Sequence, residues 1–178
     1  IAGFGYKDCL GHPAWFEPRE WLGAPEASKY PLHLISNQPR TRLHSQLDPV
    51  GESKNSKIQG REPLALNPFD AAARGLKAGD IVRVFNDRGA CLAGVTISED
   101  VRPGIVQLST GAWYDPIDPA TPGSLDSHGN PNVLTHDFGT SSLSQGPAAQ
   151  SALVEVELFA GPLPELTVHK PPTFVQEA

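Results

Sequence analysis

The 178-residue sequence contains no methionine and only two cysteines, Cys9 and Cys91. The cysteines form no C-x-x-C pair, so neither a disulfide framework nor a zinc knuckle is indicated, and we expect free thiols with Cys91 facing inward. Because the chain begins at Ile1 rather than at methionine, we interpret it as a piece of a longer protein. No stretch approaches the roughly 18 apolar residues of a membrane span, and we find no signal-peptide pattern.

Signatures of common catalytic and nucleotide-binding sites are also missing: G-x-G-x-x-G, G-x-x-x-x-G-K-[ST], G-x-S-x-G and H-E-x-x-H do not occur. The spacing of the histidines matches no common metal site, and we predict no metal ligand. Four of them are interpreted as surface or hydrogen-bonding residues: His12, His33, His128 and His169. His44, Ser45 and Asp48 invite a hydrolase interpretation, but a triad is an arrangement in space, so we name no catalytic residue.

The sequence is acidic and rich in turn-forming residues. Its 20 acidic and 14 basic residues give a net charge of −6, which argues against general binding to nucleic acid or anionic membranes. Its 17 glycines and 18 prolines stay below the roughly 25–30% that marks low-complexity disorder. With 39% hydrophobic residues, the chain is expected to fold as one domain with an arm or tail.

The predicted elements are short. An apolar run at 32–35 predicts a buried strand, and the polar stretch 39–61 is interpreted as a long surface loop. Asn67 is expected to cap a short helix that Gly75 ends. Strands are predicted at the following ranges: 81–85, 90–97, 105–108 and 152–159. The first two form a hairpin around a tight turn at 86–89, and this pattern indicates a small, mainly β barrel.

Two other features have open interpretations. Aromatic residues in the Pro/Gly-rich segment 1–31 suggest an extended arm whose rings pin it to another surface, or equally rings that cap the domain's own core. Polar stretches at 36–46 and 132–150 carry amides, hydroxyls and guanidinium groups, which suit a large anionic cofactor. Alternatively, these side chains satisfy loop backbone groups.

A series of motifs in fixed order resembles the C-terminal domain of the dimethyl sulfoxide reductase family of molybdenum enzymes. The motifs are Arg42-Leu43-His44-Ser45-Gln46, Asn67-Pro68 with Asp70-Ala71, the run from Gly75 to Val84, Arg88-Gly89, Val101-Arg102-Pro103-Gly104, the run from Gly111 to Pro116, and Asn130-Pro131-Asn132-Val133-Leu134-Thr135. Within the family, the arm residues His12-Pro13, Trp15 and Glu20-Trp21-Leu22-Gly23 lean toward biotin sulfoxide reductase, in the branch that includes trimethylamine N-oxide reductase.

The resemblance implies a double-psi β-barrel, mainly β with short helices and long loops. It divides the chain into an aromatic arm at 1–31, a molybdopterin guanine dinucleotide-binding barrel at 32–160 and an extended tail at 161–178. It also implies that the loop after the first strand contacts pterin and pyrophosphate through Ser36, Asn37, Gln38, Arg42, His44 and Ser45. Asn132 is implied at a pterin edge, and Gln145 and Gln150 at further polar contacts.

The implied cofactor is bis-molybdopterin guanine dinucleotide, with the protein ligand to molybdenum outside this chain. The implied function is reduction of an S-oxide or N-oxide by oxygen-atom transfer, as part of a larger enzyme whose remaining domains are the partners. The expected compartment is the bacterial cytoplasm or periplasm, with the cytoplasm favoured. The alternative is a cofactor-free double-psi barrel that binds proteins or presents substrates, because fold does not fix function.

Overall fold

The structure is a computed structural model that describes residues 2–171 and 174. Within them, six strands close into a barrel in the order β1-β5-β2-β4-β3-β6. The strands are β1 Leu32–Ile35, β2 Pro63–Leu66, β3 Ile81–Phe85, β4 Ala90–Ile97, β5 Ile105–Leu108 and β6 Ala152–Leu158. The helices are α1 Gly51–Ser56 and α2 Pro68–Ala73, with 3₁₀ turns η1 Ala2–Phe4, η2 Pro25–Ser28 and η3 Pro131–Val133.

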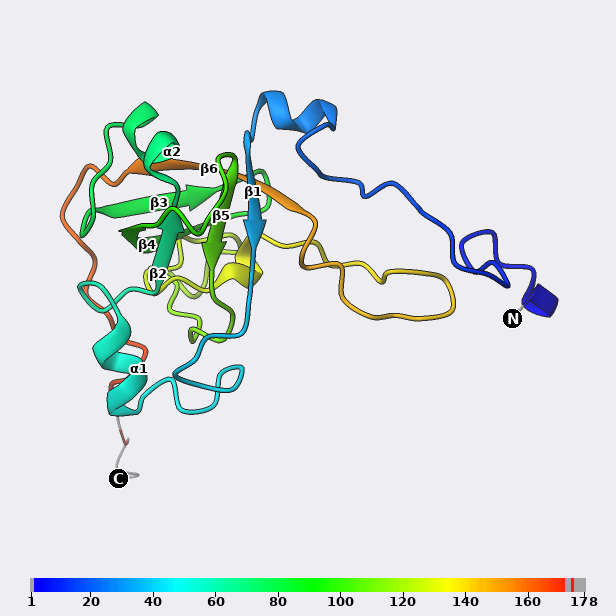
Figure 1. The fold of residues 1–178 in the computed structure, drawn as a ribbon. Coiled ribbons are helices and arrows are strands. Elements are labelled where there is room, and N and C mark those ends of the chain that lie inside the picture. Colours follow the sequence, from blue (N-terminus) through cyan, green and yellow to red (C-terminus); the bar gives the residue numbers. More distant parts are fainter. Residues whose placement is uncertain (1, 172–173, 175–178) are drawn as a thin grey trace.

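Two pairs of neighbouring strands in the barrel are parallel, β1 with β5 and β2 with β4, and the other four pairs are antiparallel. Parallel neighbours cannot be joined by a tight hairpin, so long connections cross the barrel between them. These connections carry the irregular segments seen around the barrel (Figure 1). The predicted fold, a mainly β double-psi barrel with short helices and long loops, is confirmed.

Aliphatic side chains from all six strands fill the barrel. Leu34, Leu64, Val82 and Val106 are fully buried, and each such side chain contributes about 1.5–3 kcal/mol relative to exposure. Cys91 on β4 is buried in the same cluster, as predicted, and burial raises the pKa of its thiol well above the usual value.

Local sequence signals were sufficient to predict α2 and the β3–β4 hairpin. The Asn67 side chain accepts a hydrogen bond from the Phe69 N–H at 2.9 Å, Pro68 occupies the first turn, and Gly75 follows with φ +65°. The tight turn between β3 and β4 is closed by the Asn86 N–H, which donates to the Gly89 carbonyl at 3.1 Å. All of these contacts span only a few residues.

The interpretation of 39–61 as a long surface loop was wrong. The segment contains α1, and it leads directly into β2, a strand that was not predicted either. Arg42, Asp48 and Ser53 are buried, because they pair with one another and with groups from other segments. Burying polar groups is costly unless they are hydrogen-bonded or paired, and these contacts meet that requirement.

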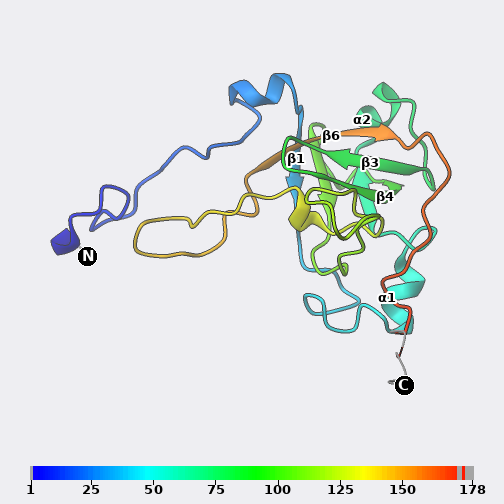
Figure 2. The same cartoon turned by 180° about the vertical axis from the view of Figure 1, so that it is seen from behind.

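The arm projects away from the barrel, with the loop at 137–150 running beside it in both views (Figures 1 and 2). A hydrogen bond of 2.8 Å from the Ser142 N–H to the Asp8 carboxylate joins the two segments. The large side chains of the arm stay exposed, with Trp15 82% and Phe4 65% accessible. These two rings therefore do not cap the domain's own core.

Candidate functional site

Two adjoining hollows lie where the loop after β1 meets η3 and the segment after β5. The first, called the site hollow, has a volume of about 360 Å³ and is lined by His44, Ser45, Thr110, Gly111, Ala112, Trp113, Tyr114, Asn130 and Asn132. The second has about 340 Å³ and is lined by Arg88, Gly89, Tyr114, Gly123, Ser124, Asn132, Val133, Thr135 and Asp137. Because Tyr114 and Asn132 line both, the hollows form one continuous surface.

Three of the predicted cofactor residues meet at the site hollow. His44 and Ser45 come from the loop after β1, whereas Asn132 comes from η3, nearly ninety residues later. The Asn130 side chain fixes the start of η3 by accepting a hydrogen bond from the Asn132 N–H at 2.9 Å. This bond leaves the Asn132 amide side chain at the exposed surface of both hollows.

The loop with His44 lies directly against the segment after β5, which carries Gly111 and Trp113. A Cβ on Gly111 would collide with the His44 carbonyl, and Gly111 also adopts φ +93°, so only glycine permits this approach. The Trp113 indole N–H donates to the Ser45 carbonyl at 2.7 Å. Two independent contacts thus fix the position of His44 and Ser45.

Four other predicted residues hold the loop backbone at the end of β1. The Gln150 amide accepts from the Ser36 N–H at 3.1 Å and donates to the Ser36 carbonyl at 2.7 Å, so it continues the pairing of β1 with β6. The Asn37 amide donates to the Gln38 carbonyl at 3.1 Å, and Gln38 donates to the Arg42 carbonyl at 2.9 Å. These contacts match the interpretation in which polar side chains satisfy loop backbone groups.

Arg42 and Gln145 lie elsewhere. The Arg42 side chain has no exposed surface, and its guanidinium contacts Glu62, Ser53 and the Thr110 carbonyl, so a phosphate cannot reach it in this arrangement. Gln145 lies in the projecting loop, where its amide donates to the Ser141 carbonyl at 3.0 Å. The structure therefore does not bring these two residues to the site hollow.

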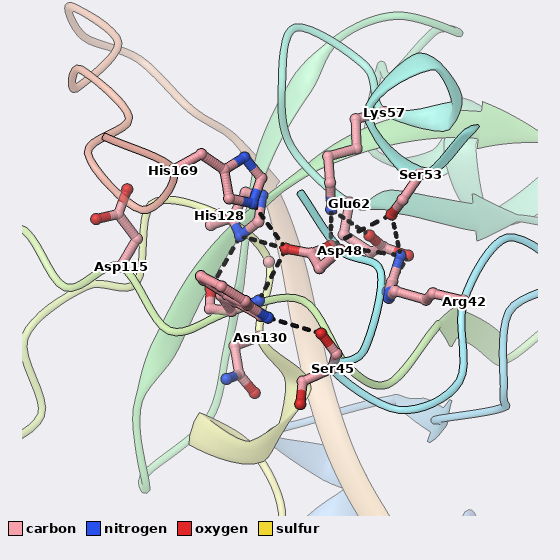
Figure 3. A network of polar contacts seen from close by, with 12 residues as sticks. Arg42, Ser45, Asp48, Ser53, Lys57, Glu62, Asp115, His128, Asn130 and His169 are labelled. Atoms are coloured by element: carbon pink, nitrogen blue, oxygen red, sulfur yellow. Dashed lines mark hydrogen bonds and ion pairs between the residues drawn. The ribbon is translucent and has the colours of Figure 1, made fainter. Parts of the chain in front are cut away.

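Behind the site hollow lies a buried network centred on Asp48 (Figure 3). The Asp48 carboxylate pairs with Lys57 at 2.9 Å and with the His169 Nε2 at 3.0 Å. Burial by itself raises the pKa of Asp48, but the hydrogen bond and charge of Lys57 outweigh it and lower the pKa to about 2. Arg42 and Lys57 also bind Glu62, so two cations balance two anions.

The His128 ring sits beside this network. Its Nδ1 donates to the Trp113 carbonyl at 2.9 Å, while its Nε2 is buried without a hydrogen-bond partner among the described residues. Burial and the charge of Lys57 lower the pKa of His128 to about 4. His128 is therefore neutral at physiological pH.

Asp48, His128 and His169 place three potential metal-ligand atoms within 4.8 Å of one another. However, the Lys57 ammonium lies 2.9 Å from one Asp48 oxygen, and the Arg42 guanidinium lies 3.7 Å from it. A divalent ion at this position would be repelled by both cations. We therefore interpret the cluster as an ion-pair network.

Four residues of the site hollow were not predicted as site residues: Thr110, Trp113, Tyr114 and Asn130. The available signal was the pair of motifs at 111–116 and 130–135, which carried the family resemblance. Their meeting depends on the barrel closing, and spacing along the chain does not reveal it.

Comparison with known proteins identifies the family of the chain. Residues 32–153 match the family model described as "Molydopterin dinucleotide binding domain". The chain belongs to this molybdopterin dinucleotide-binding domain family. The match covers the whole barrel up to the first residues of β6 and includes every residue of both hollows.

Relatives of this molybdopterin dinucleotide-binding domain confirm the resemblance to the dimethyl sulfoxide reductase family. The chain is 48% identical over 97% of its length to a dimethyl sulfoxide/trimethylamine N-oxide reductase of Cereibacter sphaeroides, covering 21% of that protein. It is 48% identical over 94% of its length to trimethylamine-N-oxide reductase 1 of Escherichia coli (strain K12), covering 20%. The chain thus spans about a fifth of the length of these relatives.

A solved structure shares the fold. Acetylene hydratase from Pelobacter acetylenicus superposes with a TM-score of 0.65 at 19% identity, over 83% of this chain and 21% of that one. Among the described residues of the molybdopterin dinucleotide-binding domain, no helix is long and apolar enough to cross a membrane.

Proposed function

We propose that the chain is the part of a larger molybdenum oxidoreductase that closes over a bis-molybdopterin guanine dinucleotide cofactor. The enzyme is proposed to reduce an S-oxide or N-oxide of the dimethyl sulfoxide, trimethylamine N-oxide or biotin sulfoxide type. The observation that carries the proposal is the convergence of His44, Ser45 and Asn132 on one hollow of a domain whose family binds molybdopterin dinucleotides. The compartment, bacterial cytoplasm or periplasm with the cytoplasm favoured, stays a prediction.

The residues of the hollow fit such a cofactor chemically. Pterin edges carry both donors and acceptors, and the amide of Asn132, the hydroxyl of Ser45 and the imidazole of His44 offer both kinds of group. Trp113 and Tyr114 add partly exposed rings to the same wall. When bound, the cofactor supplies the oxygen-atom transfer, and the protein orients it and tunes its hydrogen bonding.

Within this proposal, the nine predicted residues have different roles. His44, Ser45 and Asn132 are proposed to touch the cofactor. Ser36, Asn37, Gln38 and Gln150 are proposed to shape the loop that carries His44, because their side chains or backbone already bind that loop. Arg42 anchors the same loop from the buried side. Gln145 is proposed to reach the cofactor only through contacts made by the projecting loop.

The projecting arm and loop fit the proposed partners. Exposed rings such as Phe4, Trp15 and Phe16 favour burial against another surface. Because the chain spans about a fifth of its relatives, we propose that the remaining domains of the parent enzyme cover these rings. The protein ligand to molybdenum is proposed to come from those domains as well.

The test uses the full-length enzyme that carries this chain. Asn132→Ala and His44→Ala are expected to reduce cofactor content or turnover about tenfold each, because each removes polar contacts to the bound group. Asn55→Ala on the exposed face of α1 is the matched control that leaves both quantities unchanged. Full pterin content and full activity in both site variants would contradict the site assignment.

The cofactor itself is tested separately. Oxidation of the purified full-length protein is expected to release the fluorescent form A derivative of the pterin. If none is released, the cofactor-free barrel that binds proteins or presents substrates is the better interpretation.

A further inference from the structure

We infer that the segment 161–170, called the strap, positions the wall of the site hollow through His169. This inference rests on the proposed function, because it assigns the strap a role in holding that cofactor. The strap leaves the end of β6 and runs back along the barrel toward α1 (Figures 1 and 2).

The strap is built into the barrel surface at three points before it reaches His169. Arg61 donates to the Pro164 carbonyl, and Leu166 packs against Gly60, where a Cβ would collide with it. The Thr167 hydroxyl and N–H donate to the Asp115 carboxylate at 2.6 and 2.9 Å. These contacts fix the path of the strap, so the position of His169 is defined by the fold.

At its end, His169 completes the environment of Asp48. The His169 Nε2 donates to an Asp48 oxygen at 3.0 Å, and the Trp113 N–H lies 3.3 Å from that same oxygen. Asp48 is fully buried, whereas the His169 side chain is 17% exposed. His169 is therefore a partly exposed partner of a fully buried carboxylate (Figure 3).

Trp113 is the residue through which the strap reaches the hollow. Its N–H faces Asp48, its carbonyl accepts from His128 and its indole N–H donates to the Ser45 carbonyl. The His169 ring also contacts the indole edge-on, with 5.7 Å between ring centres. A change at His169 therefore shifts Asp48 and Trp113 together, and with them the Ser45 backbone that lines the hollow. His169 is thus a positioning residue that does not itself touch the cofactor.

The test compares His169→Phe with His169→Gln in the full-length holoenzyme. Phenylalanine keeps the ring contact with Trp113 but loses the donor to Asp48, whereas the Gln amide can replace the Nε2 donor. We expect His169→Phe to release cofactor about tenfold faster than wild type, because a hydrogen bond to a buried carboxylate is lost, and His169→Gln to restore wild-type release. Lys170→Ala, which removes an exposed ion pair with Glu165, is the matched control.

Amide hydrogen exchange gives a second readout that does not need the cofactor. Peptides that contain Trp113 and Ser45 are expected to exchange faster in His169→Phe, and at the wild-type rate in His169→Gln and Lys170→Ala. Equal exchange and equal cofactor release in His169→Phe and wild type would overturn the inference, as would failure of Gln to rescue. If the wild-type enzyme contains no pterin, the proposed function fails, and exchange at Trp113 still decides whether the strap controls this wall.

Discussion

The guanidinium of Arg42 lies 2.8 Å from a carboxylate oxygen of Glu62, and neither side chain is more than 3% exposed. Arg42 belongs to the loop after β1, and Glu62 directly precedes β2, so the pair ties the site loop to the barrel. A second Arg42 nitrogen donates to Ser53 at 3.2 Å, which attaches α1 to the same loop. Removing one partner of such a pair leaves an uncompensated buried charge.

Arg42→Ala is therefore expected to destabilise the protein by about 3–5 kcal/mol, as for other broken buried ion pairs. Arg83→Ala is the matched control, because its pair with Glu157 is 40% and 52% exposed, and we expect it to cost less than about 1 kcal/mol. Urea unfolding of both variants measures the difference. Equal losses in the two variants would show that the buried pair contributes no more than an exposed one.

The Arg42 pair also explains which parts of the fold the sequence could predict. The β3–β4 hairpin and α2 depend on caps and turns within a few residues, so the local sequence is enough to predict them. Helix α1 has the sequence GESKNS, with no apolar period, and only Ser53 is buried. Its position depends on partners such as Arg42 and Asp48, and charged residues do not indicate in advance which of them will meet.

His128 makes the stability of the domain sensitive to mild acid. Its pKa is about 4 in the fold, against an ordinary value near 6.5, because burial and the charge of Lys57 disfavour the proton. The unfolded chain binds the proton more readily than the folded one. The contribution of neutral His128 to the free energy of unfolding is therefore complete above pH 6.5 and is lost as the pH falls toward 4. The expected loss is on the order of 3 kcal/mol over this window, from about 1.4 kcal/mol per pH unit.

The control for this window is His128→Asn, whose amide can still donate to the Trp113 carbonyl but does not titrate. Burial also lowers the pKa of His136, so the quantity to compare is the difference between wild type and variant in urea midpoint from pH 7 to pH 4. Asp48 titrates in a lower window, between its ordinary 3.8 and about 2, and does not contribute here. If wild type and His128→Asn lose stability in parallel, His128 is not the responsible group.

Gly111 sets the approach of the site loop to β5. Gly111→Ala is expected to displace His44 and to cost more than about 2 kcal/mol, because the new Cβ meets backbone atoms of His44 and the backbone has φ +93°. Gly79→Ala is a close control, since Gly79 has φ +88° but open space around a Cβ, so only the strain of about 1 kcal/mol applies. Thermal unfolding and pterin content measure both effects. If Gly111→Ala behaves like Gly79→Ala in both measurements, the close approach of Gly111 to His44 contributes neither to stability nor to cofactor binding.

The site itself was predictable only in part, for a related reason. His44, Ser45 and Asn132 were found through motifs that carry the family resemblance, and the structure brings them to one hollow. His128 and His169 lie about forty residues apart and in no shared motif, yet their ring centres are only 5.2 Å apart. Only closure of the barrel and the path of the strap bring such residues together.

Glu20 connects the arm to the barrel and offers a last test. Its carboxylate accepts from two Arg88 nitrogens at 2.6 and 3.0 Å and from the Leu153 N–H at 2.7 Å. Burial raises the pKa of Glu20, but Arg88 and the Leu153 N–H outweigh this and lower it below 4.5. The carboxylate therefore stabilises the fold above that pH, and its contribution is lost as the pH falls through the lowered value.

Glu20→Gln is expected to lower the free energy of unfolding by about 1.5–3 kcal/mol at pH 7, because a charge-assisted pair is lost, and by progressively less below pH 4.5. Glu26→Gln, at an exposed position in η2, is the control, and its difference in stability from wild type should not shrink as the pH falls. A Glu20→Gln deficit that stays constant from pH 7 to pH 3 would mean that the charge of Glu20 does not hold the arm.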